Sequence, residues 1–147
     1  MSFLDSLGIS GSALTASRLR MDVVAENLAN INTTRGPDGE PYRRRFVVYQ
    51  ERRPNNYLQS FSAYFNRAKE SVGGVRVVEI GEDESPFKLD YNPSHPDADE
   101  SGYVRLPNVE VVQEMVDMMS AYRAYEANIT ALNAFKDMAV KTMEIGR

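Results

Sequence analysis

Residues 108–145 read NVEVVQEMVDMMSAYRAYEANITALNAFKDMAVKTMEI and contain neither proline nor glycine. Apolar side chains recur along this stretch at alternating intervals of four and three residues, which is the heptad pattern of a helix packed along another helix. The series consists of Val111, Met115, Met118, Tyr122, Tyr125, Ile129, Leu132, Lys136, Ala139 and Met143, in which Lys136 is the charged exception. We therefore predict a C-terminal helix of about 55 Å, with Asn108 as its N-cap.

A second helical pattern occupies the N-terminal arm, residues 1–35, where we expect a helix over about residues 3–32. Its apolar stripe, at helical spacing, consists of Leu14, Met21, Val24, Leu28 and Ile31. Gly36 and Pro37 follow this arm and stop any helix. The arm is shorter than the C-terminal helix and is that helix's natural partner within the chain.

The C-terminal helix also carries apolar side chains outside the heptad series, namely Val112, Val116, Met119, Ala124, Ala131, Phe135, Met138 and Ile145. A helix that is apolar on more than one face tends to be buried on more than one face. The chain lacks the material to cover such a helix, so we expect neighbouring copies or related subunits to cover it. A heptad series also suits an ordinary helical bundle, but two arms at opposite ends of the sequence favour a terminal coiled coil.

Between the arms, residues 36–107 contain all seven prolines of the chain. Residues 46–49 and 75–80 are predicted to form short strands, while residues 55–71 have no clear periodicity. The prolines in residues 92–96 disfavour a helix there. The predicted fold is therefore mainly α with a β insert: residues 1–35 and 108–147 form a coiled-coil domain, and residues 36–107 form a β-rich, partly extended region.

Composition excludes several classes of protein. A net charge of −4 argues against a nucleic-acid binder. No apolar run approaches the roughly 20 residues that span a bilayer, so we expect no direct membrane insertion. The absence of cysteine excludes disulfides and thiolate metal sites. Because Asp5 precedes any basic residue, we expect no cleavable secretory signal.

Motifs that could support chemistry are weak, and we expect no catalytic, cofactor-binding or metal-binding residue. His95 is the sole histidine and lacks a partner for a two-histidine site. Residues 97–102 match the first half of a calcium loop, but Asn108 stands at the position that needs a bidentate glutamate. The basic run of residues 43–45 is expected to form salt bridges to acidic neighbours in an assembly.

Several segments resemble the proteins of the bacterial flagellar rod and hook. Residues 12–14 and 25–33 (AENLANINT) resemble the N-terminal signature that these axial proteins share, and the C-terminal helix resembles their closing helix. Sharper likenesses are GPDGEPYR at residues 36–43, YNPSHPDAD at 91–99, GYVRLPNV at 102–109, EMVDM at 114–118 and AYRAYEAN at 121–128. The block at residues 91–109 narrows the resemblance to one group of proximal-rod proteins within this family.

The resemblance implies a structural subunit of the proximal rod of the flagellar basal body, which transmits torque for motility. It also implies export by the flagellar type III apparatus without signal cleavage, assembly in the periplasm, and packing of the terminal helices against other copies and other rod proteins. Three alternatives remain open: another axial protein of the same family, a soluble coiled-coil adaptor, and a calcium-binding module.

The assembly interface is expected on apolar and asparagine side chains of both arms. These are Leu14, Met21, Val24, Asn27, Leu28, Asn30, Ile31, Val111, Met115, Met118, Tyr122, Tyr125, Asn128, Ile129, Leu132, Phe135 and Met143.

Overall fold

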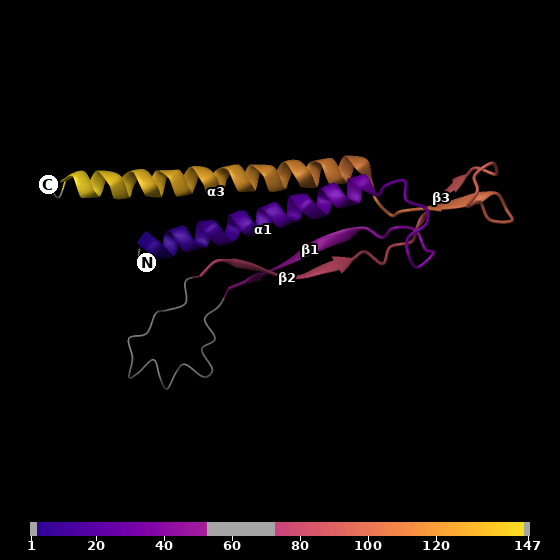
Figure 1. Ribbon diagram of the computed structural model, residues 1–147, viewed down its shortest axis with the longest axis horizontal. Helices are drawn as coiled ribbons and strands as arrows, with labels where there is room; N and C mark the ends of the chain where they lie inside the picture. Colours follow the sequence, from indigo (N-terminus) through magenta and orange to yellow (C-terminus); the bar gives the residue numbers. More distant parts are fainter. Residues whose placement is uncertain (1–2, 53–72, 146–147) are drawn as a thin grey trace, which may run out of the picture.

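Two long helices dominate the computed structural model, which describes residues 3–52 and 73–145 (Figure 1). Helix α1 spans Phe3–Ala29 and helix α3 spans Val111–Ile145. They pack against each other in antiparallel directions, so both termini lie at the same end of the molecule. Both predicted helical arms are confirmed. With lengths of about 40 Å and 52 Å, α3 extends past the start of α1 (Figure 1).

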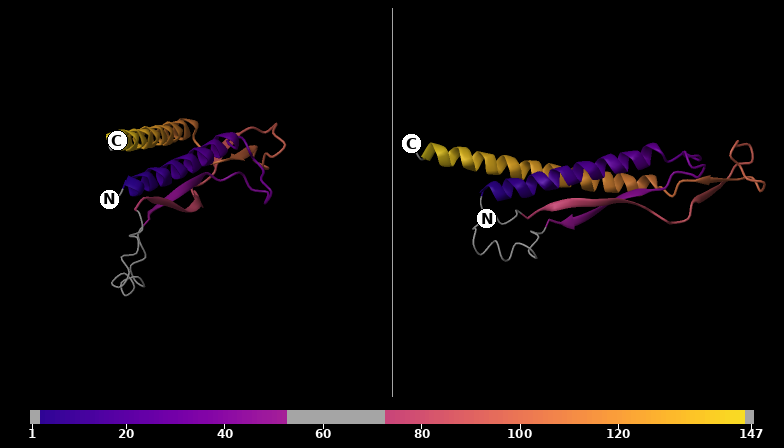
Figure 2. Two further views of the ribbon diagram at one scale, coloured as in Figure 1. Left: turned by 60° about the vertical axis from the view of Figure 1, so that its left-hand side comes forward. Right: turned by 60° about the horizontal axis from the view of Figure 1, so that its bottom comes forward.

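The two predicted strands are also confirmed and form an antiparallel hairpin. Strand β1 spans Arg45–Glu51 and strand β2 spans Val75–Glu82. Helix α1 contacts α3 and both strands, so the order of layers is α3, α1, hairpin (Figures 1 and 2). The stretch at residues 55–71, for which the sequence shows no clear periodicity, lies outside the described residues.

A second hairpin, which the sequence analysis did not predict, lies at the end of the molecule away from the termini (Figure 1). It pairs β3, Lys88–Tyr91, with β4, Tyr103–Leu106. The rings of Tyr91 and Tyr103 meet edge to face with centroids 5.2 Å apart. A small core of Val104, Pro107 and Val109 connects this hairpin to the start of α3.

Helix α1 and the β1–β2 hairpin are held together by contacts between backbone and side chains. The Val75 amide donates to Ser12 Oγ at 3.2 Å, and the Tyr49 hydroxyl donates to the Ala16 carbonyl at 3.3 Å. Gly74 makes this close approach possible, because a Cβ at this position would lie 2.5 Å from Ser12 Oγ. Its φ of 136° also lies in a region that glycine tolerates best.

Candidate functional site

The face of α3 that packs on α1 is shifted from the predicted heptad series. Buried and half-buried side chains follow a four–three spacing through Glu114, Met118, Ala121, Tyr125, Asn128, Leu132, Phe135 and Ala139. Four of these, Met118, Tyr125, Leu132 and Ala139, belong to the predicted series. The other predicted positions lie on a neighbouring face of the helix. Helix α3 therefore carries two adjacent heptad-spaced seams, of which α1 covers one.

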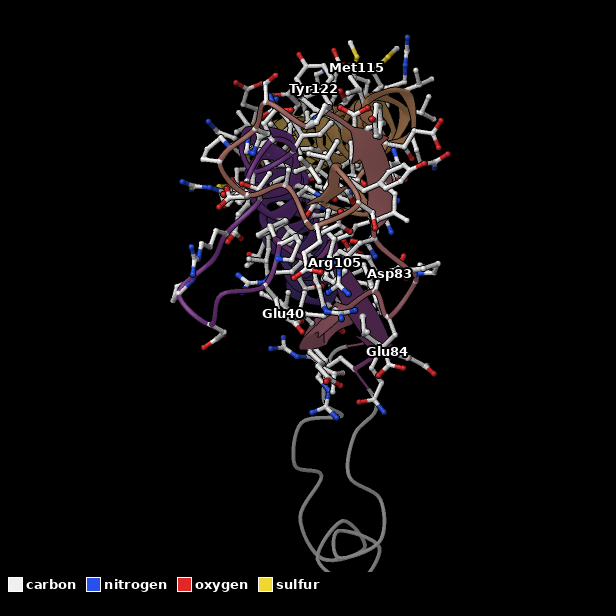
Figure 3. All side chains as sticks on the ribbon, turned by 90° about the vertical axis from the view of Figure 1, so that its right-hand side faces the viewer. Glu40, Asp83, Glu84, Arg105, Met115 and Tyr122 are labelled. Carbon is white, nitrogen blue, oxygen red and sulfur yellow. The ribbon has the colours of Figure 1, made fainter. Side chains whose placement is uncertain are left out.

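The outer face of α3 is apolar along its first three turns and is exposed. Its residues and exposed fractions are Val111 45%, Val112 68%, Met115 55%, Val116 55%, Met119 59% and Tyr122 57%. We call these six residues the outer apolar face. Figure 3 shows Met115 and Tyr122 at the outermost edge of the molecule, pointing away from α1 and the hairpins.

On the opposite side of the same turns, Asn27 of α1 forms the centre of a buried polar junction. Its Nδ2 donates to the Arg45 carbonyl and to Glu114 Oε2, each at 2.9 Å. Its Oδ1 accepts from the Tyr42 hydroxyl and the Arg45 amide, each also at 2.9 Å. Both donor and both acceptor positions of the amide are thus used. This side chain, which is 0% exposed, joins α1, α3 and the start of β1.

Arg44 supplies the charge that balances the buried carboxylate in this junction. Glu114 is 0% exposed, and its Oε1 accepts from Arg44 Nε at 2.6 Å. The same guanidinium donates through Nη2 to Asp117 at 3.1 Å, while Arg20 of α1 donates to the other oxygen of Asp117 at 2.8 Å. Two arginines, one on α1 and one just before β1, therefore alternate with two carboxylates of α3. The buried charge of Glu114 is tolerable because it is paired in this way.

Tyr42 completes the polar junction and has a strongly shifted acidity. Burial raises the pKa of the Tyr42 hydroxyl to about 12, and the nearby Glu26 carboxylate adds to the effect. The Arg45 guanidinium, with its carbon 5.7 Å from the centre of the Tyr42 ring, opposes it. The hydroxyl therefore stays protonated over the physiological range and remains a hydrogen-bond donor to Asn27.

Asn108 does not cap α3 as predicted. The helix begins at Val111, and its first backbone bond runs from the Glu114 amide to the Glu110 carbonyl at 3.0 Å. The Asn108 side chain instead accepts from the Arg44 amide at 2.8 Å and donates to the Asp83 carbonyl at 2.9 Å. Asn108 thus bonds to the residue just before β1 and to the residue just after β2, and it links this hairpin to the start of α3.

The expected interface residues fall into three groups. Val24 and Asn27 are buried within their own chain; Val111, Met115, Tyr122, Ile129 and Met143 are exposed. Half-buried are Leu14, Met21, Leu28, Asn30, Ile31, Met118, Tyr125, Asn128, Leu132 and Phe135. Two asparagines in the set bond to their own helix, Asn30 to the Glu26 carbonyl at 3.0 Å and Asn128 to the Ala124 carbonyl at 2.8 Å.

The basic run at residues 43–45 forms ion pairs within its own chain, in contrast to the expected pairs with neighbouring subunits. Besides Arg44, Arg45 pairs with Glu26 at 2.8 Å and Arg43 lies 3.5 Å from Glu40. The sequence offered one signal for the junction, since a run of three arginines beside apolar strand residues needs carboxylates nearby. It did not indicate that the carboxylates would come from α3.

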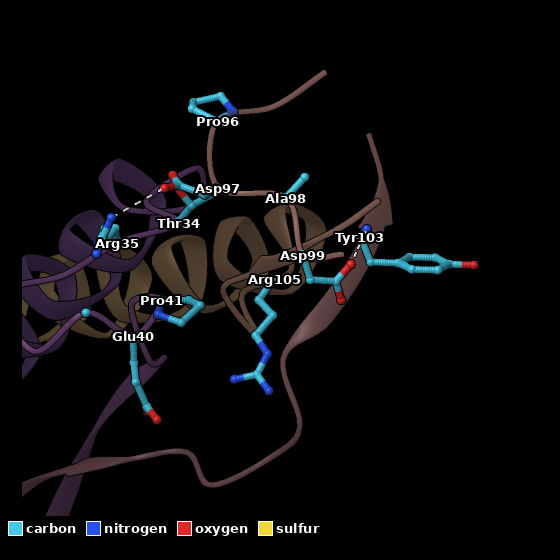
Figure 4. Close-up of a pocket in the computed structure, with 11 residues that line it drawn as sticks. Thr34, Arg35, Glu40, Pro41, Pro96, Asp97, Ala98, Asp99, Tyr103 and Arg105 are labelled. Atoms are coloured by element: carbon cyan, nitrogen blue, oxygen red, sulfur yellow. Dashed lines mark hydrogen bonds and ion pairs between the residues drawn. The ribbon is translucent and has the colours of Figure 1, made fainter. Parts of the chain in front are cut away.

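Two carboxylates of the weak calcium-loop motif already accept hydrogen bonds from within the chain. Asp99 accepts from the amides of Ser101 and Tyr103 at 2.9 and 2.8 Å, and Asp97 accepts from the Thr34 hydroxyl at 2.8 Å. These contacts border an open pocket of about 310 Å³ between the loop after α1 and the β3–β4 hairpin (Figure 4). Within residues 3–52 and 73–145, no group of three or more potential metal ligands is assembled.

Neither helix has an apolar stretch that could cross a membrane, as judged on the described part of the chain.

Both helical arms match families of flagellar proteins. Residues 7–37 match the family described as flagella basal body rod protein, and residues 100–145 match the C-terminal family of the flagellar basal body rod FlgEFG proteins. The first match contains most of α1, and the second contains β4 and α3. Antiparallel terminal helices with these signatures define the class of flagellar basal-body rod proteins.

Relatives of similar length narrow the class further. The chain is 48% identical to the flagellar basal-body rod protein FlgC of Bacillus subtilis over all of both chains. It is 47% identical to FlgC of Borreliella burgdorferi, over 94% of this chain and 93% of the relative, and 45% identical to FlgC of Escherichia coli O157:H7 over all of both. The chain therefore belongs to the FlgC family of flagellar basal-body rod proteins. It is a structural subunit of the rod and not an enzyme.

Proposed function

We propose that this chain is a subunit of the proximal rod, and that it polymerises by packing its two terminal helices against other copies and other rod proteins. The observation that carries the proposal is the outer apolar face of α3. Six large apolar side chains, each at least 45% exposed, lie together on three turns of one helix. Burying such side chains is worth about 25 cal/mol per Å² of apolar area. An assembled rod recovers this energy, whereas the free subunit does not.

The C-terminal part of α3 supports the same proposal. It extends past the start of α1 (Figure 1) and exposes Met138 at 53%, Val140 at 47% and Met143 at 76%. Another long helix can accompany it over that length. A coiled coil between subunits, formed along the second heptad seam of α3, meets this requirement.

Export without a cleavable signal and assembly in the periplasm form the second part of the proposal. The lack of cysteine suits such a route, because no disulfide can form while the chain passes between compartments. The subunit contains both an internal polar junction and exposed apolar faces. It therefore has the means to fold after export and then to join the rod.

The test compares basal bodies purified from the source bacterium with the same fractions from a strain that lacks the flagellar export apparatus. Mass spectrometry is expected to find the chain in the rod fraction of the first strain and not of the second. A chain that stays soluble in the cytoplasm of both strains would contradict the proposal and favour a coiled-coil adaptor.

A further inference from the structure

The β1–β2 hairpin has an open hollow, lined by both apolar and charged side chains, on the side that faces away from α1. Phe46 and Val48 line it, with exposed fractions of 41% and 38%. The Phe46 ring lies against Gly81, where a Cβ would come within 2.8 Å of the ring. The hollow has a volume of about 690 Å³. This volume accommodates one or two large side chains from another molecule.

The rim of this hollow is acidic. Glu79, Glu82 and Glu84 border it. Glu82 pairs with Arg45 at 3.4 Å, whereas Glu79 and Glu84 form no ion pair with any described residue. Arg43 also reaches the rim, but Glu40 and the Phe87 ring already engage its guanidinium. A hollow that combines two exposed apolar side chains with two carboxylates left unpaired by the described residues fits a partner that presents an aromatic or thioether side chain beside a cation.

The outer apolar face of α3 ends in that combination. Met119 and Tyr122 are 59% and 57% exposed, and the next residue, Arg123, is exposed without an ion pair to any described residue. Met119 and Arg123 are four residues apart and therefore lie on the same side of the helix. One chain thus contains both a hollow with an acidic rim and a basic apolar knob, by which we mean Met119, Tyr122 and Arg123.

The order of layers places these two features on opposite sides of the subunit. Helix α1 separates α3 from the hairpin (Figure 1), and Figure 3 shows Tyr122 and Glu84 at opposite edges of the molecule. A subunit therefore cannot bring its own knob to its own hollow. Two different patches on opposite sides form a head-to-tail contact, which repeats into an open helical array when the rotation does not close.

We propose that Met119, Tyr122 and Arg123 of one copy dock into the hollow formed by Phe46 and Val48, beside Glu79 and Glu84, of a second copy. The proposal rests on the assignment of the chain as a rod subunit and names the contact by which successive copies pack. The occupant is a second copy because the outer face of α3 provides both the apolar side chains and the missing cation. Charge complementarity sets the register, and apolar burial supplies the affinity.

Paired cysteines test this contact in assembled basal bodies. The chain contains no native cysteine, so the introduced thiols are the only thiols of this chain. Cells that carry both Val48→Cys and Met119→Cys in one chain are expected to yield, with a short bismaleimide, a ladder of dimers and higher multimers. Each single variant is expected to yield monomers, because a head-to-tail contact brings unlike residues together.

The matched control replaces Met119→Cys by Ser120→Cys, an exposed position whose side chain points about 100° away around the helix. Val48→Cys with Ser120→Cys is expected to give no ladder. Dimers from Val48→Cys alone would overturn the proposal. Monomers from the Val48→Cys and Met119→Cys chain, with swimming and rod incorporation intact, would overturn it and leave the rod assignment standing.

Charge reversal gives an independent readout. Arg123→Glu or Glu84→Arg alone is expected to lower the yield of cross-linked multimers about threefold, a typical size for a rim ion pair. The combination of both restores the yield if the two side chains face each other. A combined variant no better than either single one would overturn the pairing. Failure of the unmodified chain to enter basal bodies would instead contradict the rod assignment.

Discussion

Along its first three turns, α3 reverses the arrangement of charged and apolar side chains that is usual in a soluble protein. The side that faces α1 is buried and carries the carboxylates Glu114 and Asp117. The side that faces solvent is apolar, with Val112 and Met119 more than half exposed. Charge usually lies outside and apolar area inside. In this helix the polar junction organises the subunit, and the apolar residues remain for the assembly.

This difference teaches that stability and assembly depend on different residues of the same helix. A polar junction gives geometry, because each hydrogen bond requires a particular partner. An apolar face gives affinity with less demand on exact neighbours, and the flexible thioethers of Met115 and Met119 suit it. Substitutions on the α1-facing side should therefore change the stability of the free subunit, whereas substitutions on the outer apolar face should change its assembly.

The largest effect on the free subunit is expected from Glu114→Ala. It removes the carboxylate that balances Arg44 and leaves an amide proton of Asn27 without its acceptor. Because Asp117 still pairs with Arg44, we expect a loss of about 3 kcal/mol in the free energy of unfolding, at the low end for a broken buried pair. Urea denaturation followed by circular dichroism measures it. Glu110→Ala, at an exposed position just before α3, is the control and should change the value little.

A smaller loss, about 2 kcal/mol, is expected for Asn27→Ala, because buried partners of the amide are left unsatisfied. The combined variant Asn27→Ala with Glu114→Ala should lose less than the sum of the two single losses, since both remove the same hydrogen bond. Strict additivity in a double-mutant cycle would show that the two side chains do not act together, and the junction would then lose its role as one unit.

The sequence predicted the helices and the two strands of the first hairpin because their patterns are local, whereas the pairing of those strands comes from the structure. The face of α3 that packs on α1 was harder to predict, because the prediction rests on the more apolar of two heptad series. In the folded chain the α1-facing seam passes through Glu114 and Asn128, and it uses Ala121, which is only 2% exposed. The seam that looks more apolar in the sequence includes much of the exposed surface. The rule that apolar side chains lie inside and charged ones outside therefore fails for this helix.

The polar junction could not be predicted, because its bonds join distant parts of the chain. Asn27 meets a carboxylate 87 residues further on, and Asn108 meets the Arg44 amide 64 residues before it. Local rules assign Asn108 to a helix cap, but the tertiary contacts compete successfully for its side chain. The β3–β4 hairpin was missed because each strand has four residues and a long turn, residues 92–102, separates them.

Tyr42→Phe tests the edge of the junction and should cost about 1 kcal/mol at neutral pH, the typical value of one hydrogen bond. Its pH dependence has a definite sign. The pKa of the Tyr42 hydroxyl is raised to about 12 from the ordinary value of 10.0, so its contribution is complete below pH 10 and is lost as the pH rises towards 12. Between pH 8 and about pH 11, the urea midpoint should fall more for the wild type than for Tyr42→Phe. Equal falls would show that Tyr42 titrates normally.

The smallest effect on the free subunit, and the sharpest contrast with the junction, is expected from Met115→Glu. Met115 is 55% exposed on the outer apolar face, so the free energy of unfolding should stay within about 0.5 kcal/mol of the wild-type value. The same charge placed in an apolar contact between subunits must be desolvated without a partner. Incorporation into basal bodies and swimming should therefore be lost, whereas Met115→Leu, which keeps volume and polarity similar, should retain both. Wild-type incorporation of Met115→Glu would place this face against solvent in the rod, and a stability loss comparable to that of Glu114→Ala would end the separation between the two sides of α3.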